Sequence, residues 1–125
     1  MPPIPTDAEL DILAVLWRLG PSTVREAHLA LGKHRGYTTT LKQMQVMTEK
    51  GLLVRNERFR SHVYEVCAPK ENTRRQIAGD LLRRAFEGSA KDLLLGALQA
   101  QPASDAELAE IRRALKDLEK KRGSR

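Results

Sequence analysis

The 125-residue sequence contains one cysteine, Cys67, and only 4% aromatic residues. A single cysteine excludes an internal disulfide framework and any metal site built only of cysteines within one chain, and it indicates a reducing compartment. No stretch approaches the apolar length that spans a bilayer, and the first residues lack the charged and apolar regions of a signal peptide. We therefore expect a cytoplasmic protein that does not insert into a membrane.

The sequence also lacks a recognisable catalytic arrangement. His28, His34 and His62 lie in different predicted elements and form no known pairing of a nucleophile with a base. Cys67 has no second cysteine or histidine at the spacing typical of a zinc or copper site. Carboxylates near the end of the chain alternate with basic residues at helical spacing, which is typical of a solvated face. We predict that the protein is not an enzyme, needs no cofactor and holds no metal.

Enough apolar residues are present for a folded protein. Hydrophobic residues make up 41% and charged residues 30%, a balance typical of globular chains. Because aromatics are scarce, the core must consist of aliphatic side chains, and two small units would each contain little apolar mass, so an oligomer is expected. Lys and Arg number 22 against 16 Asp and Glu, a formal charge of +6, which favours a polyanionic partner such as nucleic acid.

The first part of the chain predicts three helices followed by a hairpin. Two capping boxes, each a threonine with a glutamate three residues later, indicate helix starts after Thr6 and after Thr23. Glycines then mark the helix ends, and two runs rich in β-forming residues flank a basic stretch. The predicted elements are a helix over residues 7–19, a short helix that ends at Gly32, a helix over 37–50, and a hairpin of residues 52–55 and 62–66.

The third predicted helix has one side suited to packing and one suited to DNA. Thr40, Met44 and Met47 share a face at helical spacing, so the polar residues opposite them should face solvent. Two short helices joined by a tight turn present the second helix to a major groove, and a basic hairpin beside them can reach the phosphates. Basic residues on a hairpin can instead serve to protect an edge strand from aggregation. Hydroxyls suit phosphate, lysine suits guanine or phosphate, and glutamine suits adenine. The predicted DNA-binding residues are Thr38, Thr39, Lys42 and Gln45 of the helix and Arg55, Arg58, Arg60, Ser61 and His62 of the hairpin.

Three further helices are predicted in the remainder of the chain, before Gly88, before Pro102, and after a capping box at Ser104. The middle helix is so rich in leucine that some would be exposed in a lone three-helix unit, and the last helix has apolar residues close to heptad spacing. We therefore predict a winged-helix DNA-binding domain of residues 1–70 and a helical dimerisation domain of residues 71–125. The predicted dimerisation residues are Leu93, Leu94, Leu98, Ile111, Leu115 and Leu118.

Short motifs occur in a characteristic order along the chain. They are Thr6-Asp7-Ala8-Glu9 with Trp17, Gly20-Pro21, Val24-Arg25-Glu26, Tyr37-Thr38-Thr39-Thr40, Glu49-Lys50-Gly51-Leu52, Arg60-Ser61-His62-Val63-Tyr64 and Phe86-Glu87-Gly88-Ser89. This ordered set resembles the penicillinase-repressor family of bacterial winged-helix regulators, which includes the methicillin-resistance and copper-transport repressors. The resemblance implies a mainly α fold with a small β-hairpin wing and three interlocking C-terminal helices. It also implies a homodimer that represses transcription by binding a palindromic operator in double-stranded DNA.

Two departures from this family concern the inducing signal. Copper-responsive relatives carry a cysteine-rich C-terminus, whereas this chain has no cysteine after Cys67, so copper sensing is not expected. In the β-lactam-responsive branch a sensor protease cuts an Asn-Phe bond in the middle C-terminal helix, but the equivalent stretch here reads Leu95-Gly96-Ala97-Leu98. The inducing signal stays open, with a membrane sensor protease as one candidate partner.

Two alternatives to a DNA-binding repressor of this kind stay open. The winged helix can serve as a scaffold for protein interactions in an adaptor, or a small molecule can gate DNA binding. The wing arginines and the polar helix face favour DNA, because a protein-interaction surface would more often expose aromatic anchors there. The sequence shows no pocket-lining aromatic or charged cluster in support of ligand gating.

Overall fold

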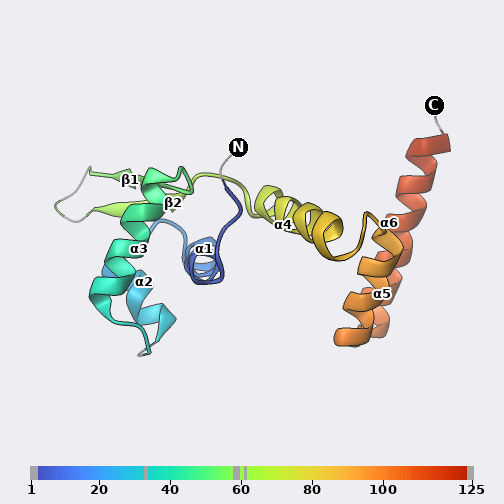
Figure 1. The fold of residues 1–125 in the computed structure, drawn as a ribbon, viewed down its shortest axis with the longest axis horizontal. Helices are drawn as coiled ribbons and strands as arrows, with labels where there is room; N and C mark the ends of the chain where they lie inside the picture. The colour runs from blue at the N-terminus through green and yellow to red at the C-terminus, as the bar shows by residue number, and fades with distance from the viewer. Residues whose placement is uncertain (1–2, 33, 58–59, 61, 124–125) are drawn as a thin grey trace. The chain divides into compact units, whose positions relative to one another are not determined.

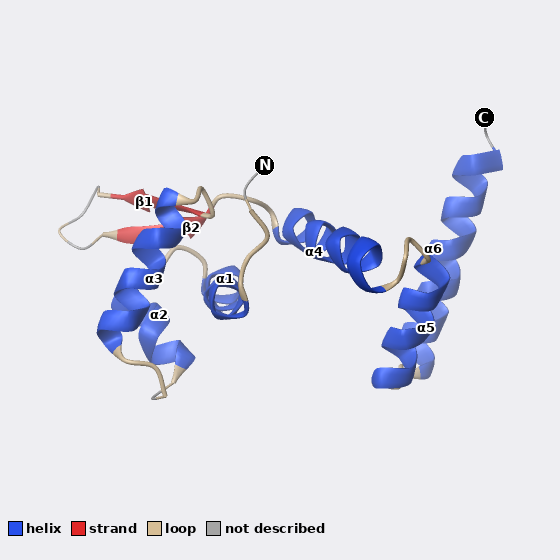
Figure 2. Cartoon of the chain, viewed as in Figure 1, coloured by secondary structure: helices blue, strands red, loops and turns tan. Residues whose placement is uncertain are grey.

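The computed structural model describes residues 3–32, 34–57, 60 and 62–123, and these form helices with one two-stranded hairpin (Figure 1). Figure 2 shows the helices in blue and the hairpin in red. The prediction of a mainly α fold, with a winged helix-turn-helix followed by three helices, is confirmed. The elements are α1 (Asp7–Leu19), α2 (Val24–Leu31), α3 (Tyr37–Glu49), β1 (Leu53–Asn56), β2 (Val63–Val66), α4 (Lys70–Ala85), α5 (Ala90–Ala100) and α6 (Asp105–Gly123).

Both predicted capping boxes at the starts of α1 and α2 are present. The Glu9 amide donates to Thr6 Oγ1 at 3.2 Å, and the Thr6 amide donates to Glu9 Oε1 at 3.0 Å. Thr23 and Glu26 make the same two bonds, also at 3.2 and 3.0 Å. These contacts satisfy amides that the first helical turn leaves without a partner, so local sequence defines where each helix begins.

The hairpin is antiparallel and is joined to the loop between α1 and α2. Leu53 pairs with Val66, and Arg55 pairs with Tyr64. Ser22 and Tyr64 exchange two backbone hydrogen bonds, at 3.0 and 2.8 Å, which add a short third pairing beside β2. Because side chains alternate along a strand, these two cross-strand pairs lie on the same face of the hairpin.

A single aliphatic core joins α1, α2, α3 and the hairpin. As expected from the scarcity of aromatics, it contains only one aromatic side chain, Tyr64, among the buried residues that the structure describes. Trp17, Leu31, Leu41 and Val66 pack against this core while half-buried. The buried hydrophobic residues are Ile12, Leu13, Val15, Leu16, Val24, Ala27, Met44, Met47, Leu52, Leu53 and Tyr64.

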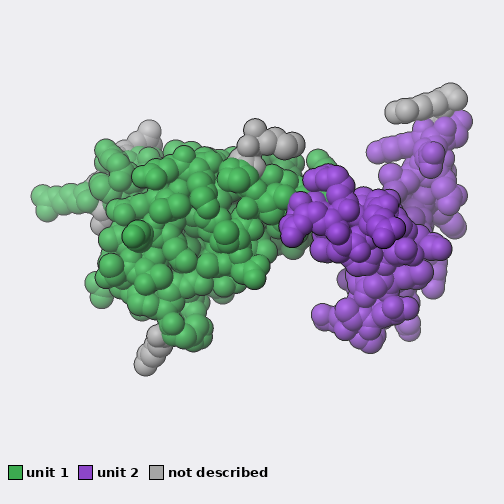
Figure 3. Space-filling view, viewed as in Figure 1, with its two compact units in different colours: residues 1–79 green, residues 80–125 purple. Residues whose placement is uncertain are grey.

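The chain divides into two compact units, residues 1–79 and 80–125, which are coloured separately in Figure 3. In the second unit, Ser89 Oγ accepts from the Asp92 amide and Ser104 Oγ accepts from the Glu107 amide, both at 3.1 Å, at the starts of α5 and α6. None of the described residues of this unit is buried. The assignment of residues 1–70 to DNA binding and of 71–125 to dimerisation stays a prediction.

Within the described residues, no helix is both long enough and apolar enough to cross a membrane.

Candidate nucleic-acid interface

Helix α3 has the two faces that its sequence predicts. Thr40, Met44 and Met47 are buried, and the helix packs against α1, α2 and β1. This burial confirms the predicted packing side and leaves the polar side of the helix accessible to a ligand. The predicted DNA-binding residues on this helix, all exposed, are Thr38, Thr39, Lys42 and Gln45.

The start of α3 is held by side chains of the preceding helix and turn. Thr40 Oγ1 lies 3.3 Å from His28 Nδ1, and the His28 ring meets the Tyr37 ring edge-on with 5.6 Å between their centroids. Arg35 in the turn donates a hydrogen bond to Gln43 Oε1 at 3.2 Å. The second helix of the helix-turn-helix is therefore fixed on α2 and on the turn.

The end of α3 is anchored to the start of α1. Lys50 Nζ donates to Glu9 Oε2 at 2.7 Å, and the Glu9 side chain is 7% exposed. Burial raises the pKa of Glu9, but the hydrogen bonds from Lys50 and from the Thr6 amide together lower it by more than burial raises it. The pKa of Glu9 therefore lies below its ordinary value. At neutral pH the pair is ionised and fixes the orientation of α3 on α1.

A cavity of about 430 Å³ lies where the start of α2, the side of α3 and the hairpin meet, and we call it the wing cavity. Among its lining residues are three arginines and a histidine, and no carboxylate lines it within the described part of the chain. Such a concave cationic surface attracts an anion, and arginine suits phosphate in particular. The lining residues are Thr23, Val24, Arg25, Tyr37, Leu41, Gln45, Arg55, Arg60, His62 and Tyr64.

The wing cavity includes some of the predicted DNA-binding residues but not all of them. Gln45 comes from the helix, and Arg55, Arg60 and His62 come from the hairpin and the chain beside it. Three others, Thr38, Thr39 and Lys42, are exposed on α3 without lining this cavity. The two remaining predicted residues, Arg58 and Ser61, lie outside the described residues.

Six of these lining residues were not among the predicted site residues, and two of the six, Arg25 and Tyr37, are exposed. Arg25 is exposed in the first turn of α2, and Tyr37 is the exposed first residue of α3. The position of Arg25 could have been noticed in the sequence, because an arginine two positions after the cap of a short helix lies near the free amide groups that favour an anion. What sequence reasoning missed is that the hairpin brings its own arginines to the same place.

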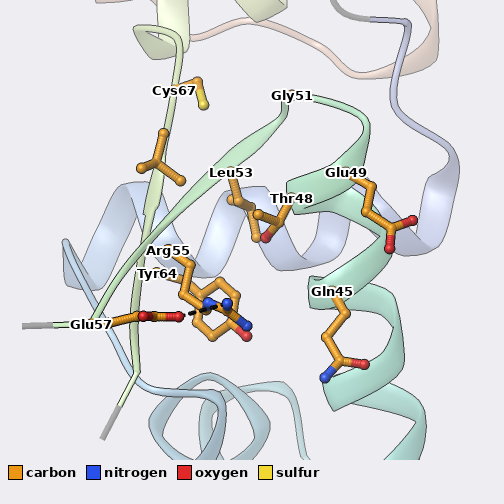
Figure 4. A pocket seen from close by; sticks show the side chains of 10 residues that line it. Gln45, Thr48, Glu49, Gly51, Leu53, Arg55, Glu57, Tyr64 and Cys67 are labelled. Carbon is orange, nitrogen blue, oxygen red and sulfur yellow. Dashed lines mark ion pairs between the residues drawn. The ribbon is translucent and has the colours of Figure 1, made fainter. Parts of the chain in front are cut away.

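Arg55 also lines a larger cavity, of about 720 Å³, between α3 and β1, which we call the α3–β1 cavity (Figure 4). Here its guanidinium forms an ion pair with Glu57, with 2.6 Å between Nη2 and Oε1. Figure 4 shows this pair over the Tyr64 ring, with Gln45 across the cavity on α3. The lining residues are Gln45, Thr48, Glu49, Gly51, Leu53, Val54, Arg55, Glu57, Tyr64 and Cys67.

Among the described residues, no group of three or more histidine, cysteine, aspartate or glutamate side chains is placed to hold a metal ion. Cys67 is a free thiol on the surface, and partial burial raises its pKa, so it is largely protonated at neutral pH. The polar, cationic surface of α3 and the wing is thus the candidate site.

Comparison with known proteins gives one family match. A family model described as penicillinase repressor matches residues 5–117, which is most of the chain. No curated protein matches the sequence.

Proposed function

The chain belongs to the penicillinase repressor family of transcriptional regulators, and we propose that it represses transcription as a homodimer bound to an operator of two inverted half-sites. The observation that carries this proposal is the wing cavity, which three arginines line and no carboxylate of the described residues lines. Beside this cavity, α3 exposes its polar face, while its opposite face is buried against the core. This combination suits a duplex, which offers phosphates beside base edges.

We assign the contacts by the chemistry of each side chain. Gln45 bonds adenine and Lys42 bonds guanine in the major groove, each contributing about 1–3 kcal/mol of discrimination. Thr38 and Thr39, at the start of α3, hold phosphates and set the register. The arginines of the wing cavity, Arg25, Arg55 and Arg60, neutralise the flanking phosphates, and His62 lies beside them.

Dimerisation through the C-terminal helices is supported by the apolar side chains that the single chain leaves exposed. Leu94, Leu115 and Leu118 are 37%, 45% and 58% exposed, and each lies at a predicted dimerisation position. Complete burial of a fully exposed side chain of this size stabilises a protein by about 1.5–3 kcal/mol, and a second copy that covers these half-exposed leucines gains a part of this amount for each of them. The other proposed interface residues are Leu93, Leu98 and Ile111.

Induction by a sensor protease is not part of this proposal. The stretch Leu95-Gly96-Ala97-Leu98 lies within α5 and lacks the Asn-Phe bond that such a protease cuts in the β-lactam-responsive branch of the family.

The proposal is tested by selecting binding sites from random DNA with the full-length chain. We expect an inverted repeat whose half-sites are separated by about one helical turn or a multiple of it. Lys42→Ala should weaken binding to the selected site, whereas Lys91→Ala, which removes the same charge from an exposed position on α5, should not. Failure to enrich any sequence, or equal effects of the two substitutions, would refute specific recognition by α3.

A further inference from the structure

Arg55, which lines both the wing cavity and the α3–β1 cavity, forms an ion pair with Glu57, which lines the α3–β1 cavity. The two residues are two positions apart along an extended chain, so their side chains lie on the same side of the hairpin, which is the side that carries Tyr64. The guanidinium and carboxylate approach to 2.6 Å. An arginine proposed to contact phosphate is therefore already neutralised by a carboxylate in the protein without DNA.

This ion pair is accessible enough to be exchanged. The Arg55 side chain is 39% exposed and the Glu57 side chain 59% exposed, so water screens their attraction and the pair holds only weakly. A DNA phosphate offers the same guanidinium a bidentate partner of equal geometry. Binding of a phosphate at Arg55 must, however, displace or closely approach the Glu57 carboxylate, and like charges repel each other.

Gln45 connects this exchange to base recognition. Gln45 and Arg55 both line both cavities, one from α3 and one from β1, and Figure 4 shows them on opposite sides of the α3–β1 cavity. A duplex that is seated by a base contact at Gln45 brings its backbone towards Arg55, whereas a loosely bound duplex does not. The cost of displacing Glu57 is therefore overcome most readily on a sequence that α3 recognises.

We propose that Glu57 determines specificity by restraining Arg55, so that random-sequence DNA is bound less tightly than the basic surface would otherwise allow. This inference rests on the proposed function and adds to it a positioning residue that itself makes no contact with a base. Glu57 acts through Arg55, and its effect disappears when Arg55 is removed.

The test is a double-mutant cycle on full-length protein, with a labelled random-sequence duplex and the selected operator as probes. Glu57→Gln should raise affinity for the random duplex about fivefold at about 0.1 M salt and steepen the plot of log affinity against log salt by about one unit, as expected for one gained phosphate contact. Operator affinity should rise less, so the specificity ratio falls. In an Arg55→Gln background, Glu57→Gln should change random-duplex affinity by less than about twofold, because the restrained cation is absent.

Glu65→Gln is the matched control, because Glu65 pairs in register with Val54 on the opposite face of the hairpin and its loss changes the net charge equally. Its effect on either probe should stay below about twofold. Equal effects of Glu57→Gln and Glu65→Gln, additivity with Arg55→Gln, or equal gains on operator and random DNA would overturn the inference while leaving DNA binding intact. If the wild-type chain binds neither probe, the proposed function fails and this inference fails with it.

Discussion

Among the residues that the structure describes, eleven hydrophobic side chains are buried in the first compact unit, residues 1–79, whereas none is buried in the second unit, residues 80–125. Both units contain well-capped helices, so the difference does not lie in local helix signals. It lies in what covers the apolar faces. The first unit covers them with its own hairpin and helices, while the second leaves several leucines exposed, which we propose a second copy covers.

The largest effect is expected from placing a charge on the exposed leucine face of α5. Leu94→Asp or Leu98→Asp should convert the proposed dimer to monomers, because each substitution acts twice in a symmetric interface and places a charge where apolar side chains would be covered. Sedimentation velocity at micromolar concentration measures this change. Gln99→Asp introduces the same charge at an exposed position of α5 and should leave the dimer intact. A wild-type chain that sediments as a monomer would contradict dimerisation through the second unit.

A core substitution in the first unit should behave differently from a surface substitution in the second. Leu13→Ala removes a fully buried side chain and should lower the free energy of unfolding by about 2–5 kcal/mol at any protein concentration. Leu115→Ala should lower it only at concentrations where the wild type is dimeric. Urea unfolding at low and high protein concentration separates the two cases, and equal effects of Leu115→Ala at both concentrations would mean that this residue packs within one chain.

The Glu9–Lys50 pair should stabilise the first unit in a pH-dependent way. Because the pKa of Glu9 is lowered in the folded state, its contribution is fully present above the ordinary glutamate value of 4.5 and is lost as pH falls through the lowered pKa. Glu9→Gln should therefore cost about 1.5–3 kcal/mol at neutral pH and less at about pH 3. Unfolding curves at both pH values measure the difference, with the exposed Glu71→Gln as control. A cost that is unchanged by pH would contradict a lowered pKa of Glu9 in the folded state.

The smallest effects are expected from single cations of the wing cavity. Arg25→Ala and Arg60→Ala should each weaken binding to any DNA sequence and reduce the salt slope by about one unit. Fluorescence anisotropy over a range of salt concentrations measures both quantities. Arg112→Ala removes an exposed arginine from the second unit and should change neither. If all three variants have the same salt slope, the wing cavity is a solvated surface rather than a phosphate site.

Local signals were sufficient to predict most of the fold. The capping threonines and terminal glycines predicted α1 with the bounds that the structure has, and the spacing of Thr40, Met44 and Met47 predicted the buried face of α3. These features depend on residues within one or two helical turns of each other. Both strands of the hairpin were predicted to within one residue at each end.

The composition of the wing cavity could not be predicted in the same way. Arg25 joins Arg55 and Arg60 there because Ser22 pairs with Tyr64, a contact between segments about forty residues apart that no periodicity in the sequence encodes. The Arg55–Glu57 ion pair depends on rotamers and on the face of the strand, and it was likewise missed. Short-range pattern thus predicted the elements, and long-range pairing determined which side chains meet.

In the proposed complex, two copies of one α3 surface read two inverted half-sites. A binding selection from random DNA tests this directly, with Gln45→Ala beside the wild type and with Gln99→Ala as the matched control on α5. Gln45→Ala should lose base preference at one corresponding position in each half-site, while Gln99→Ala should keep the full inverted repeat. Preference retained at every position by Gln45→Ala, or lost in one half-site only, would contradict this proposal.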